Sequence, residues 1–475
     1  MNKSKEVIGR RAELETLEDC FNSPKAEFLA LYGRRRVGKT FLIREVFGQN
    51  FLFYATGVLG GDTAAQLAHF NEEIARAGGR NLPVATDWHQ AFSNLNHILE
   101  TSKRTGKKVI FLDEVPWLST PKSGFLAALD YFWNRHASAR KDVLLIICGS
   151  AASWIIDNVV NDTGGLHNRL TRQIRLQPFC LKECEAYFKA MGIDIPRYQI
   201  AEAYMIFGGI PYYLSLFRPR YSLAQNVDGI YFGEGAPLGN EYPNLYRSLF
   251  RNPEGHMHII EALAGKNAGQ TRSEICLVSG CTHGGGLTKV LKELESSGFL
   301  REYQAFDKKQ RDRIYQLIDP FTLFCLRFSE KRSLYSSDFW LRFSTTPAHS
   351  AWAGYAFEML CMLHLPQIRR ALGISGVLTE VSSWKSKASD PGAQIDLVID
   401  RADRVINLCE MKYASAPYAI DKKTDMSLRN KRAAFLEETH TRKAAHITMV
   451  TPYGLKKNAY EAGIPFQITL DDLFE

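Results

Sequence analysis

The stretch GRRRVGKT, residues 33–40, decides the fold of the N-terminal part of the chain. It follows the apolar run EFLALYG (27–33), which predicts a buried parallel strand. It precedes KTFLIREVFG (39–48), whose apolar spacing predicts a helix that ends at Gly48. The pattern G-x-x-x-x-G-K-[ST] between a strand and a helix is typical of a phosphate-binding loop. The sequence therefore predicts an α/β fold, a P-loop NTPase with a parallel sheet.

The residues of this loop suit the phosphates of ATP. Gly33 and Gly38 let the backbone curl so that its N–H groups point at phosphates, and the following helix adds its positive end. Lys39 is expected to reach the β and γ phosphates, and the Thr40 hydroxyl to ligate Mg²⁺. The variable positions are Arg34, Arg35, Arg36 and Val37. We expect the three arginines to point outward, although one of them could touch a phosphate. The alternative is an accidental match, which the flanking strand and helix argue against.

The segment KKVIFLDEVPWL (107–118) is the second chemical signal. An apolar strand that ends in acidic residues is the Walker B pattern. Asp113 is expected to hold Mg²⁺, directly or through water, and Glu114 to polarise the attacking water. The alternative is a strand followed by an ordinary acidic turn.

Two further polar residues are candidates for contact with the γ-phosphate. Ser150 ends the predicted strand in DVLLIICGSAASWI (142–155), and its alternative role is that of a helix N-cap. Arg169 precedes a strand-like alternation at 173–176 and could neutralise charge on the γ-phosphate, in its own subunit or a neighbour's. A solvated basic loop is the alternative for Arg169, and His167 is expected at the surface.

These segments together resemble the archaeal-type ATPase family, which belongs to the STAND class of signal-transduction ATPases and is related to AAA+ enzymes. The resemblance covers about residues 1–250 and rests on VIGRRAELETLEDCF (7–21), LYGRRRVGKTFLIREVF (31–47), VIFLDEVPWL (109–118), IICGS (146–150) and LQPFCLKECEAYF (176–188). It implies a helical lid whose G-x-P motif packs its proline by the adenine, which Gly209, Ile210 and Pro211 match. The same residues also read simply as the end of one helix and the start of the next. The resemblance further implies that residues 8–10 cover the base.

Residues 251–335 have the pattern of a winged helix-turn-helix: three predicted helices are followed by an alternating hairpin with a charged tip at 307–312. In the third helix, 287–296, Lys289 and Lys292 could face DNA. The wing would carry Lys308, Lys309, Arg311 and Arg313. Glu293 and Glu295 beside the helix lysines weaken this interpretation, and such domains also serve as spacers or protein-docking modules.

The C-terminal quarter holds another group of charged residues within apolar elements. Glu358 lies in the predicted helix WAGYAFEMLCMLHL (352–365). The segment AQIDLVIDRADRVINLCEMKY (393–413) predicts two antiparallel strands, with Asp396 on the first and Glu410 and Lys412 on one face of the second. Charges in such apolar strands are costly unless they are paired or bound to metal.

This arrangement resembles the PD-(D/E)XK nuclease fold, that is, a restriction-endonuclease-like α/β domain. The resemblance implies that Asp396 and Glu410, helped by Glu358, bind Mg²⁺, and that Lys412 orients or activates the attacking water or stabilises the pentacovalent phosphorus. Ile395 stands where a proline often stands in this motif. The alternatives are a nuclease-like fold that serves as a scaffold, or two unrelated strands with a salt bridge. The predicted helix that follows carries cations that suit a nucleic-acid backbone or a solvated face, namely Lys422, Lys423, Arg429, Lys431 and Arg432.

Composition sets limits on these interpretations. The chain of 475 residues has a formal net charge of +8, which permits nucleic-acid binding without demonstrating it. Its nine cysteines are scattered singly, which indicates reduced thiols in a cytoplasmic protein. The N-terminus lacks the apolar core of a signal peptide, and no apolar run reaches the roughly 20 residues of a membrane span.

We therefore expect a P-loop ATPase core (1–180), a helical lid (181–250), a winged helix (251–335) and a nuclease-like domain (345–475). The favoured function is an ATPase that uses ATP and Mg²⁺ and whose nucleotide state controls a Mg²⁺-dependent, DNA-interacting nuclease-like domain. The alternative is a STAND-type signalling switch with a catalytically silent docking domain. Either function is compatible with a nucleotide-dependent homo-oligomer and with no membrane partner.

Overall fold

A computed structural model describes residues 7–161, 168–250, 252–282, 284–306, 313–334, 338–386 and 393–475. The chain divides into two compact units. The N-terminal unit comprises residues 1–178 and 247–251, and the C-terminal unit comprises residues 179–246 and 252–475. The predicted division into four parts stays a prediction.

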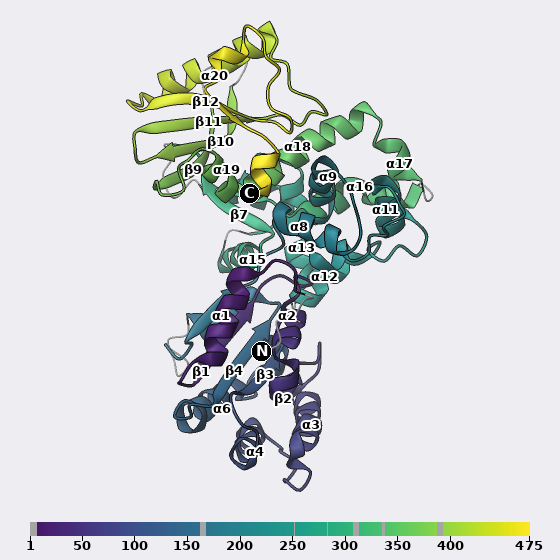
Figure 1. The fold of residues 1–475 in the computed structure, drawn as a ribbon, viewed down its shortest axis with the longest axis vertical. Helices are drawn as coiled ribbons and strands as arrows, with labels where there is room; N and C mark the ends of the chain where they lie inside the picture. The colour runs from purple at the N-terminus through teal and green to yellow at the C-terminus, as the bar shows by residue number, and fades with distance from the viewer. Residues whose placement is uncertain are drawn as a thin grey trace. The chain divides into compact units, whose positions relative to one another are not determined.

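The N-terminal unit is built on a parallel sheet with the strand order β2-β3-β4-β1-β5 (Figure 1). Its strands are β1 (Glu27–Tyr32), β2 (Phe51–Thr56), β3 (Lys108–Asp113), β4 (Val143–Gly149) and β5 (Arg172–Arg175). Every residue of β1, β3 and β4 is buried, as expected for near-continuous apolar runs inside a parallel sheet. The predicted α/β fold with a parallel sheet is confirmed. Because β4 lies between β1 and β3, the carboxyl ends of these three strands share one edge.

Helices cover the faces of this sheet. They are α1 (Arg11–Asn22), α2 (Lys39–Phe47), α3 (Thr63–Ile74), α4 (Trp88–Thr101), α5 (Val115–Leu118), α6 (Phe125–Phe132) and α7 (Ala152–Ile155). One core joins α3, α4 and α6 to alternate residues of the strands, including Phe28 and Ala30 of β1. Within it the rings of Trp88 and Phe125 meet edge to face with centroids 4.8 Å apart. This packing supports the sheet beneath the loops at its carboxyl edge.

The first part of the C-terminal unit is helical. Its helices are α8 (Leu181–Ala190), α9 (Arg197–Phe207), α10 (Pro211–Leu214) and α11 (Leu223–Val227), and α12 (Glu241–Leu249) runs across the boundary between the units. The second half of α9 is apolar and buried, and it packs against α16 (Pro320–Leu334) and α18 (Pro347–Leu363). The helix ends at Gly208, whose φ of 68° is typical of a glycine C-cap.

A small antiparallel sheet follows, with the order β6-β8-β7. It comprises β6 (Gln270–Thr271), β7 (Leu300–Gln304) and β8 (Arg313–Leu317), and it is accompanied by α13 (Pro253–Ala264), α14 (Arg272–Ser279) and α15 (Gly285–Ser296). Thr271 and Glu274 form a capping box that begins α14. The predicted wing tip with Lys308, Lys309 and Arg311 lies outside the described residues, and the winged-helix assignment stays a prediction.

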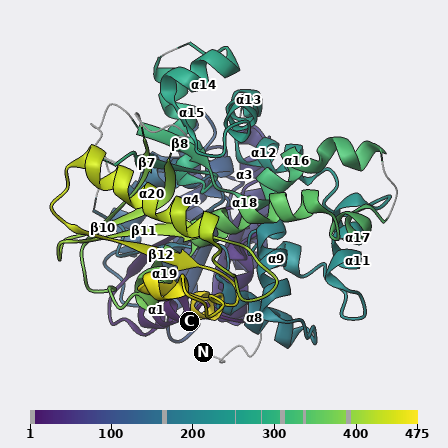
Figure 2. The same cartoon turned by 90° about the horizontal axis from the view of Figure 1, so that it is seen from above.

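The C-terminal unit ends in a mixed sheet with the order β13-β12-β11-β10-β9. Its strands are β9 (Thr379–Lys385), β10 (Gln394–Arg401), β11 (Val405–Met411), β12 (Ala444–Val450) and β13 (Phe466–Ile468); the helices are α17 (Phe339–Phe343), α19 (Leu365–Ala371) and α20 (Lys422–Thr439). Strands β9 to β11 pair antiparallel, whereas β11, β12 and β13 pair parallel. Helix α20 lies along this sheet beside β12 (Figure 2). Among the helices of the described ranges, none has the length and apolar character that crossing a membrane requires.

Candidate functional site

The loop after β1 is shaped by its two glycines. Gly33 has a φ of 150°, and a Cβ at this position would lie 2.2 Å from the carbonyl oxygen of Leu176 at the end of β5. Gly38 has a φ of 93°, with no atom within 4 Å of the corresponding Cβ position. Gly33 therefore serves close packing inside the domain, whereas Gly38 lines open space above the loop.

Lys39 lies inside the loop. Its side chain is buried, and Nζ donates hydrogen bonds to the carbonyl oxygens of Gly33 at 2.9 Å and Arg34 at 3.0 Å. These two carbonyl groups thus hold the ammonium group near the N-terminus of α2. Phosphate oxygens are stronger acceptors for an ammonium group than carbonyls, so they can replace these contacts.

The arginines of the loop differ from the prediction. Arg34 is only 6% exposed, and Arg35 and Arg36 are half-buried. The expectation that all three point outward is wrong for Arg34, because it directly follows a buried strand and Gly33, whose close approach to β5 keeps the next residue inside the domain. Val37 is buried, and its carbonyl oxygen accepts a hydrogen bond from Nη2 of the buried Arg10 at 3.3 Å.

The two groups predicted to hold Mg²⁺ lie together. The Thr40 hydroxyl donates to Oδ2 of Asp113 at 2.7 Å, and Asp113 is buried at the carboxyl end of β3. Its other oxygen accepts from the backbone N–H of Glu114 at 3.0 Å. One hydroxyl and one carboxylate at this distance are the donors that a Mg²⁺–nucleotide complex uses in P-loop proteins. The residues present therefore fit the ion.

Glu114 and Ser150 are joined directly. Glu114 has a left-handed backbone with a φ of 48°, and its Oε2 accepts from the Ser150 backbone N–H at 3.1 Å and from the Ser150 hydroxyl at 2.8 Å. The alternative role of Ser150 as a helix N-cap is not observed, because α7 has Ala151 at its N-cap. A Cβ on Gly149 would lie 2.8 Å from the ring of Pro116, so the tip of β4 lies tightly against α5.

Two predicted nucleotide contacts lie elsewhere. Arg169 is exposed in the turn before β5. Pro211 is the first residue of α10 in the C-terminal unit, after Gly209, whose Cβ would lie 2.3 Å from the Phe179 carbonyl oxygen. The segment therefore does lie between the end of α9 and the start of α10. The contact of Pro211 with the adenine stays a prediction. His167 lies outside the described residues.

In the C-terminal sheet, Glu410 of β11 binds two lysines. Nζ of Lys412 lies 2.8 Å from Oε1, and Nζ of Lys431 lies 2.7 Å from Oε2. Lys412 follows the same strand, whereas Lys431 comes from α20. Burial acts to raise the pKa of Glu410, but the two ammonium groups outweigh it and lower that pKa.

Asp396 lies at a β-bulge. Between Ile395 and Val398 the pairing with β9 shifts register, so two residues of β10 oppose one of β9. The side-chain amide of Gln394 donates to Oδ1 of Asp396 at 2.6 Å. The sequence does not indicate this bulge, because both flanking residues continue the apolar alternation.

Glu358 of α18 shares the electrostatic environment of these groups. Burial is the main cause that raises the pKa of Glu358 to about 7, and the negative charge of Asp396 adds to it, with a smaller addition from Glu410. Lys412 acts in the opposite direction. The structure thus brings the four predicted polar residues into one region. Within the described parts of the chain, however, no group of three or more His, Cys, Asp or Glu side chains is arranged to hold a metal ion.

Sequence reasoning missed Arg301 of β7, which joins the same region. Nε donates to Oε1 of Gln316 at 2.6 Å, and Nη1 to the sulfur of Met362 at 3.2 Å. The guanidinium lies 4.5 Å from the ring centroid of Tyr303. Burial lowers the pKa of Arg301, whereas the nearby charges, including Asp396, oppose that shift. An arginine in an alternating strand gives no sequence signal of this role.

The predicted basic faces are only partly present. On α20, Lys422 and Lys423 are exposed, but Lys431 points to Glu410 and Nε of Arg432 donates to the Ala445 carbonyl at 2.7 Å. Nε of Arg429 donates to Asp425 on the same helix.

On α15, Lys289 and Lys292 are exposed, while Glu293 lies 2.7 Å from Nε2 of the buried His256. Arg313 pairs with Glu302 on the neighbouring strand β7. These internal contacts reduce the charge that each surface offers to a polyanion.

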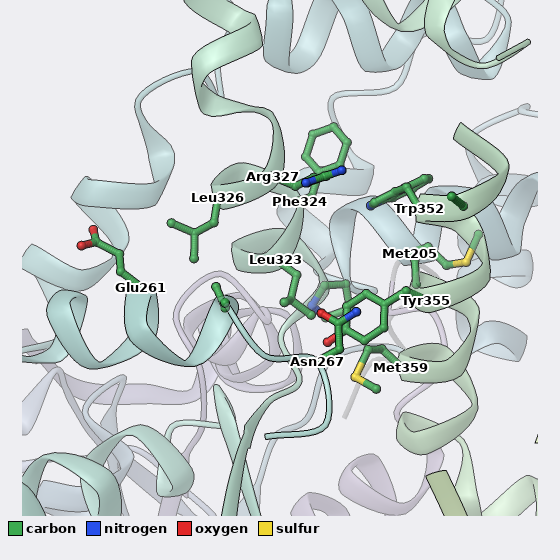
Figure 3. Close-up of a pocket in the computed structure, with 15 residues that line it drawn as sticks. Met205, Glu261, Asn267, Leu323, Phe324, Leu326, Arg327, Trp352, Tyr355 and Met359 are labelled. Carbon is green, nitrogen blue, oxygen red and sulfur yellow. The ribbon is translucent and has the colours of Figure 1, made fainter. Parts of the chain in front are cut away.

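A cavity of about 590 Å³ lies between α9, α13, α16 and α18. Figure 3 shows Trp352, Tyr355 and Met359 projecting from α18 toward α16, with Met205 of α9 beside them. Burial raises the pKa of Tyr355, and the next contribution comes from Glu358. The cavity therefore adjoins the charged region of the C-terminal sheet. Sequence reasoning missed it because its lining comes from segments far apart in the chain.

The N-terminal part of the chain matches the model of a known protein family. Residues 8–217 match the family model described as an ATPase domain predominantly from Archaea. Over 413 residues the chain is 24% identical to the uncharacterized protein MJECL04 of Methanocaldococcus jannaschii, covering 86% of this chain and 87% of that protein.

Among solved structures, the Walker-type ATPase PABY2304 of Pyrococcus abyssi is similar with a TM-score of 0.47 and 19% identity, covering 68% of this chain and 97% of that one. The ORC2 protein of Aeropyrum pernix has a TM-score of 0.34 and 13% identity, covering 69% of this chain and 97% of that one. The residues that match the family model include the P-loop, the end of β3 and the tip of β4.

Proposed function

We propose that the protein binds and hydrolyses ATP and that its nucleotide state controls the C-terminal domain. The match of residues 8–217 to the archaeal ATPase domain supports the first part of this proposal. The observation that carries this proposal is the buried Lys39 ammonium held by two loop carbonyls beside the Thr40–Asp113 pair. The P-loop and the two residues that would bind Mg²⁺, Thr40 and Asp113, thus lie together at the carboxyl edge of the parallel sheet.

Binding follows from the loop geometry. The backbone around Gly38 and the first turn of α2 offers N–H groups and the positive end of a helix to the phosphates. Lys39 exchanges its carbonyl partners for β and γ phosphate oxygens. Thr40 and Asp113 would hold Mg²⁺, which when bound neutralises the developing phosphate charge.

Hydrolysis requires an oriented water. Glu114 is the residue that accepts a proton from it or polarises it, and Ser150 fixes the Glu114 carboxylate through two hydrogen bonds. Ser150 therefore acts as a positioning residue in this state. Arg169, exposed before β5, is the candidate for neutralising the γ-phosphate from the same or a neighbouring subunit in an oligomer, and Pro211 is the candidate for contact with the adenine.

For the C-terminal domain, the mixed sheet with Asp396 and Glu410 on adjacent strands supports a nuclease-like, DNA-interacting domain. Its carboxylates are the right donor type for Mg²⁺, but as arranged they do not fit the ion, because lysines occupy both oxygens of Glu410. The same contacts favour the second candidate function, a STAND-type switch whose C-terminal domain docks a partner without cleaving DNA.

An experiment separates the two candidates. The full-length protein is incubated with ATP, Mg²⁺ and linear or branched DNA, with Glu410→Ala as the matched variant. Cleavage that depends on ATP and is lost in Glu410→Ala supports the nuclease. No cleavage by either protein, together with slow ATP hydrolysis and nucleotide-dependent oligomerisation, supports the switch. If Lys39→Ala binds and hydrolyses ATP as wild type does, both candidate functions are contradicted.

A further inference from the structure

Both carboxylate oxygens of Glu410 are engaged by lysine ammonium groups. Its side chain is 16% exposed, and each of its oxygens accepts from one ammonium group, at 2.8 Å from Lys412 and at 2.7 Å from Lys431. Charge-assisted hydrogen bonds of this length in a partly buried site are among the stronger polar contacts in proteins. A divalent cation at Glu410 must therefore displace at least one lysine and overcome its repulsion.

The second predicted ligand is also engaged. The bulge in β10 sets the position of Asp396, and the Gln394 amide donates to its Oδ1 at 2.6 Å. Positive charge nearby comes from Arg301, whose guanidinium is fixed by Gln316 and Met362. The carboxylates Glu358, Asp396 and Glu410 thus face three cationic side chains, Lys412, Lys431 and Arg301.

The metal-site motif requires neither Arg301 nor Lys431, and Lys431 is the one of these two that is seen in an ion pair with Glu410. Lys412 belongs to the Glu-x-Lys pattern of β11, whereas Lys431 reaches the site from α20. The helix is held at Asp421, whose side chain accepts from the Thr424 N–H at 2.7 Å, and by the buried Leu428 and Phe435. Its packing on the sheet thus directs one lysine to Glu410, while Lys422 remains exposed.

We propose that Lys431, together with Lys412, takes the place of a divalent cation at Glu410, so that the C-terminal domain is complete and folded without metal. Removing Lys431 leaves one oxygen of a partly buried carboxylate without its cation and opens the position to a metal ion. This inference deepens the second candidate function above and rests on the nuclease-like interpretation of this domain. It does not depend on ATP binding.

The test uses the full-length chain without nucleotide, freed of metal by a chelator, and Mn²⁺ as the probe in isothermal titration calorimetry. The control variant is Lys422→Met, which changes an exposed lysine on the same helix. In wild type and in this control, adding Glu410→Gln should leave Mn²⁺ binding unchanged. Lys431→Met should gain Mn²⁺ binding that is at least about tenfold tighter than the weakest affinity the titration detects, and the added Glu410→Gln should abolish this gain. Thermal unfolding provides a second readout, since Mn²⁺ should raise the melting temperature of Lys431→Met only.

Two results would overturn the inference. One is Mn²⁺ binding by wild type that Glu410→Gln weakens tenfold or more, which would show that the lysines yield to metal in the native chain. The other is a folded Lys431→Met variant with no gain in Mn²⁺ affinity. If Lys431→Met does not fold, the wild-type arm still decides. ATP hydrolysis by the same proteins, measured in parallel with Lys39→Ala, reports separately on the proposed function.

Discussion

Replacing Gly33 by alanine tests the packing that shapes the P-loop. The new Cβ would lie 2.2 Å from the Leu176 carbonyl oxygen, so the end of β5 must move by about 1 Å to restore contact distance. Leu176 donates its N–H to the Tyr32 carbonyl at 2.8 Å, and this movement breaks that hydrogen bond. Moving the backbone of β5 also disturbs the floor on which the loop rests.

The magnitude follows from two contributions. An alanine held at a φ of 150° costs about 1–3 kcal/mol in backbone strain. The lost hydrogen bond adds about 0.5–1.5 kcal/mol. Gly33→Ala should therefore lower the free energy of unfolding of the N-terminal unit by about 1.5–4.5 kcal/mol.

Urea unfolding followed by tryptophan fluorescence measures this loss, with two glycine variants as controls. Gly106→Ala has a φ of 78° and nothing within 4 Å, so it should cost only about 1 kcal/mol and leave ATP binding unchanged. Gly38→Ala should cost a similar amount but weaken ATP binding, because its Cβ enters the open space above the loop. Equal stability losses in Gly33→Ala and Gly106→Ala would refute the close-packing argument.

Three further outcomes are expected. Glu114→Gln should keep ATP affinity and slow hydrolysis by about 10²-fold or more, measured by phosphate release, because the amide no longer accepts a proton. Ser150→Ala should slow hydrolysis about tenfold at unchanged ATP affinity, because the Glu114 carboxylate loses its hydroxyl contact. His364, whose pKa burial lowers to about 4, stays neutral in the fold, with Nε2 accepting from the Leu181 N–H. The unfolded chain, with a histidine pKa of about 6.5, binds the proton first, so stability falls as pH drops from about 6.5 to 4. The loss of stability caused by His364 is about 2 kcal/mol at pH 5. Urea unfolding of the C-terminal unit should show this loss in wild type and not in His364→Gln. The same pH dependence in both proteins would contradict this expectation.

The N-terminal fold was predictable because its signals are local. A strand, a glycine loop and a helix follow one another within residues 27–47, and the apolar strand before Asp113 is equally short. Parallel strands with near-continuous apolar runs then force the loops to one edge of the sheet. The direct bond between Glu114 and Ser150 was beyond this reasoning, since it depends on β4 lying next to β3 and on a left-handed backbone at Glu114.

The C-terminal region shows why side-chain partners are harder to predict. The sequence places Asp396 and Glu410 on neighbouring strands correctly, whereas Lys412, predicted on the second strand, lies directly after it because β11 ends at Met411. It does not reveal that Lys431 reaches the same carboxylate, because that contact depends on how α20 packs on the sheet. Arg301 was missed for the same reason, since it lies far along the chain from Met362 of α18, which it contacts.

ATP affinity and hydrolysis of the Lys39→Ala variant test the central claim most directly. The full-length wild type should bind ATP in isothermal titration calorimetry and release phosphate in the presence of Mg²⁺. Lys39→Ala removes the ammonium group that the loop carbonyls hold, so it should lose measurable binding and turnover. A wild type without affinity for ATP, or a Lys39→Ala variant with unchanged turnover, would contradict the account.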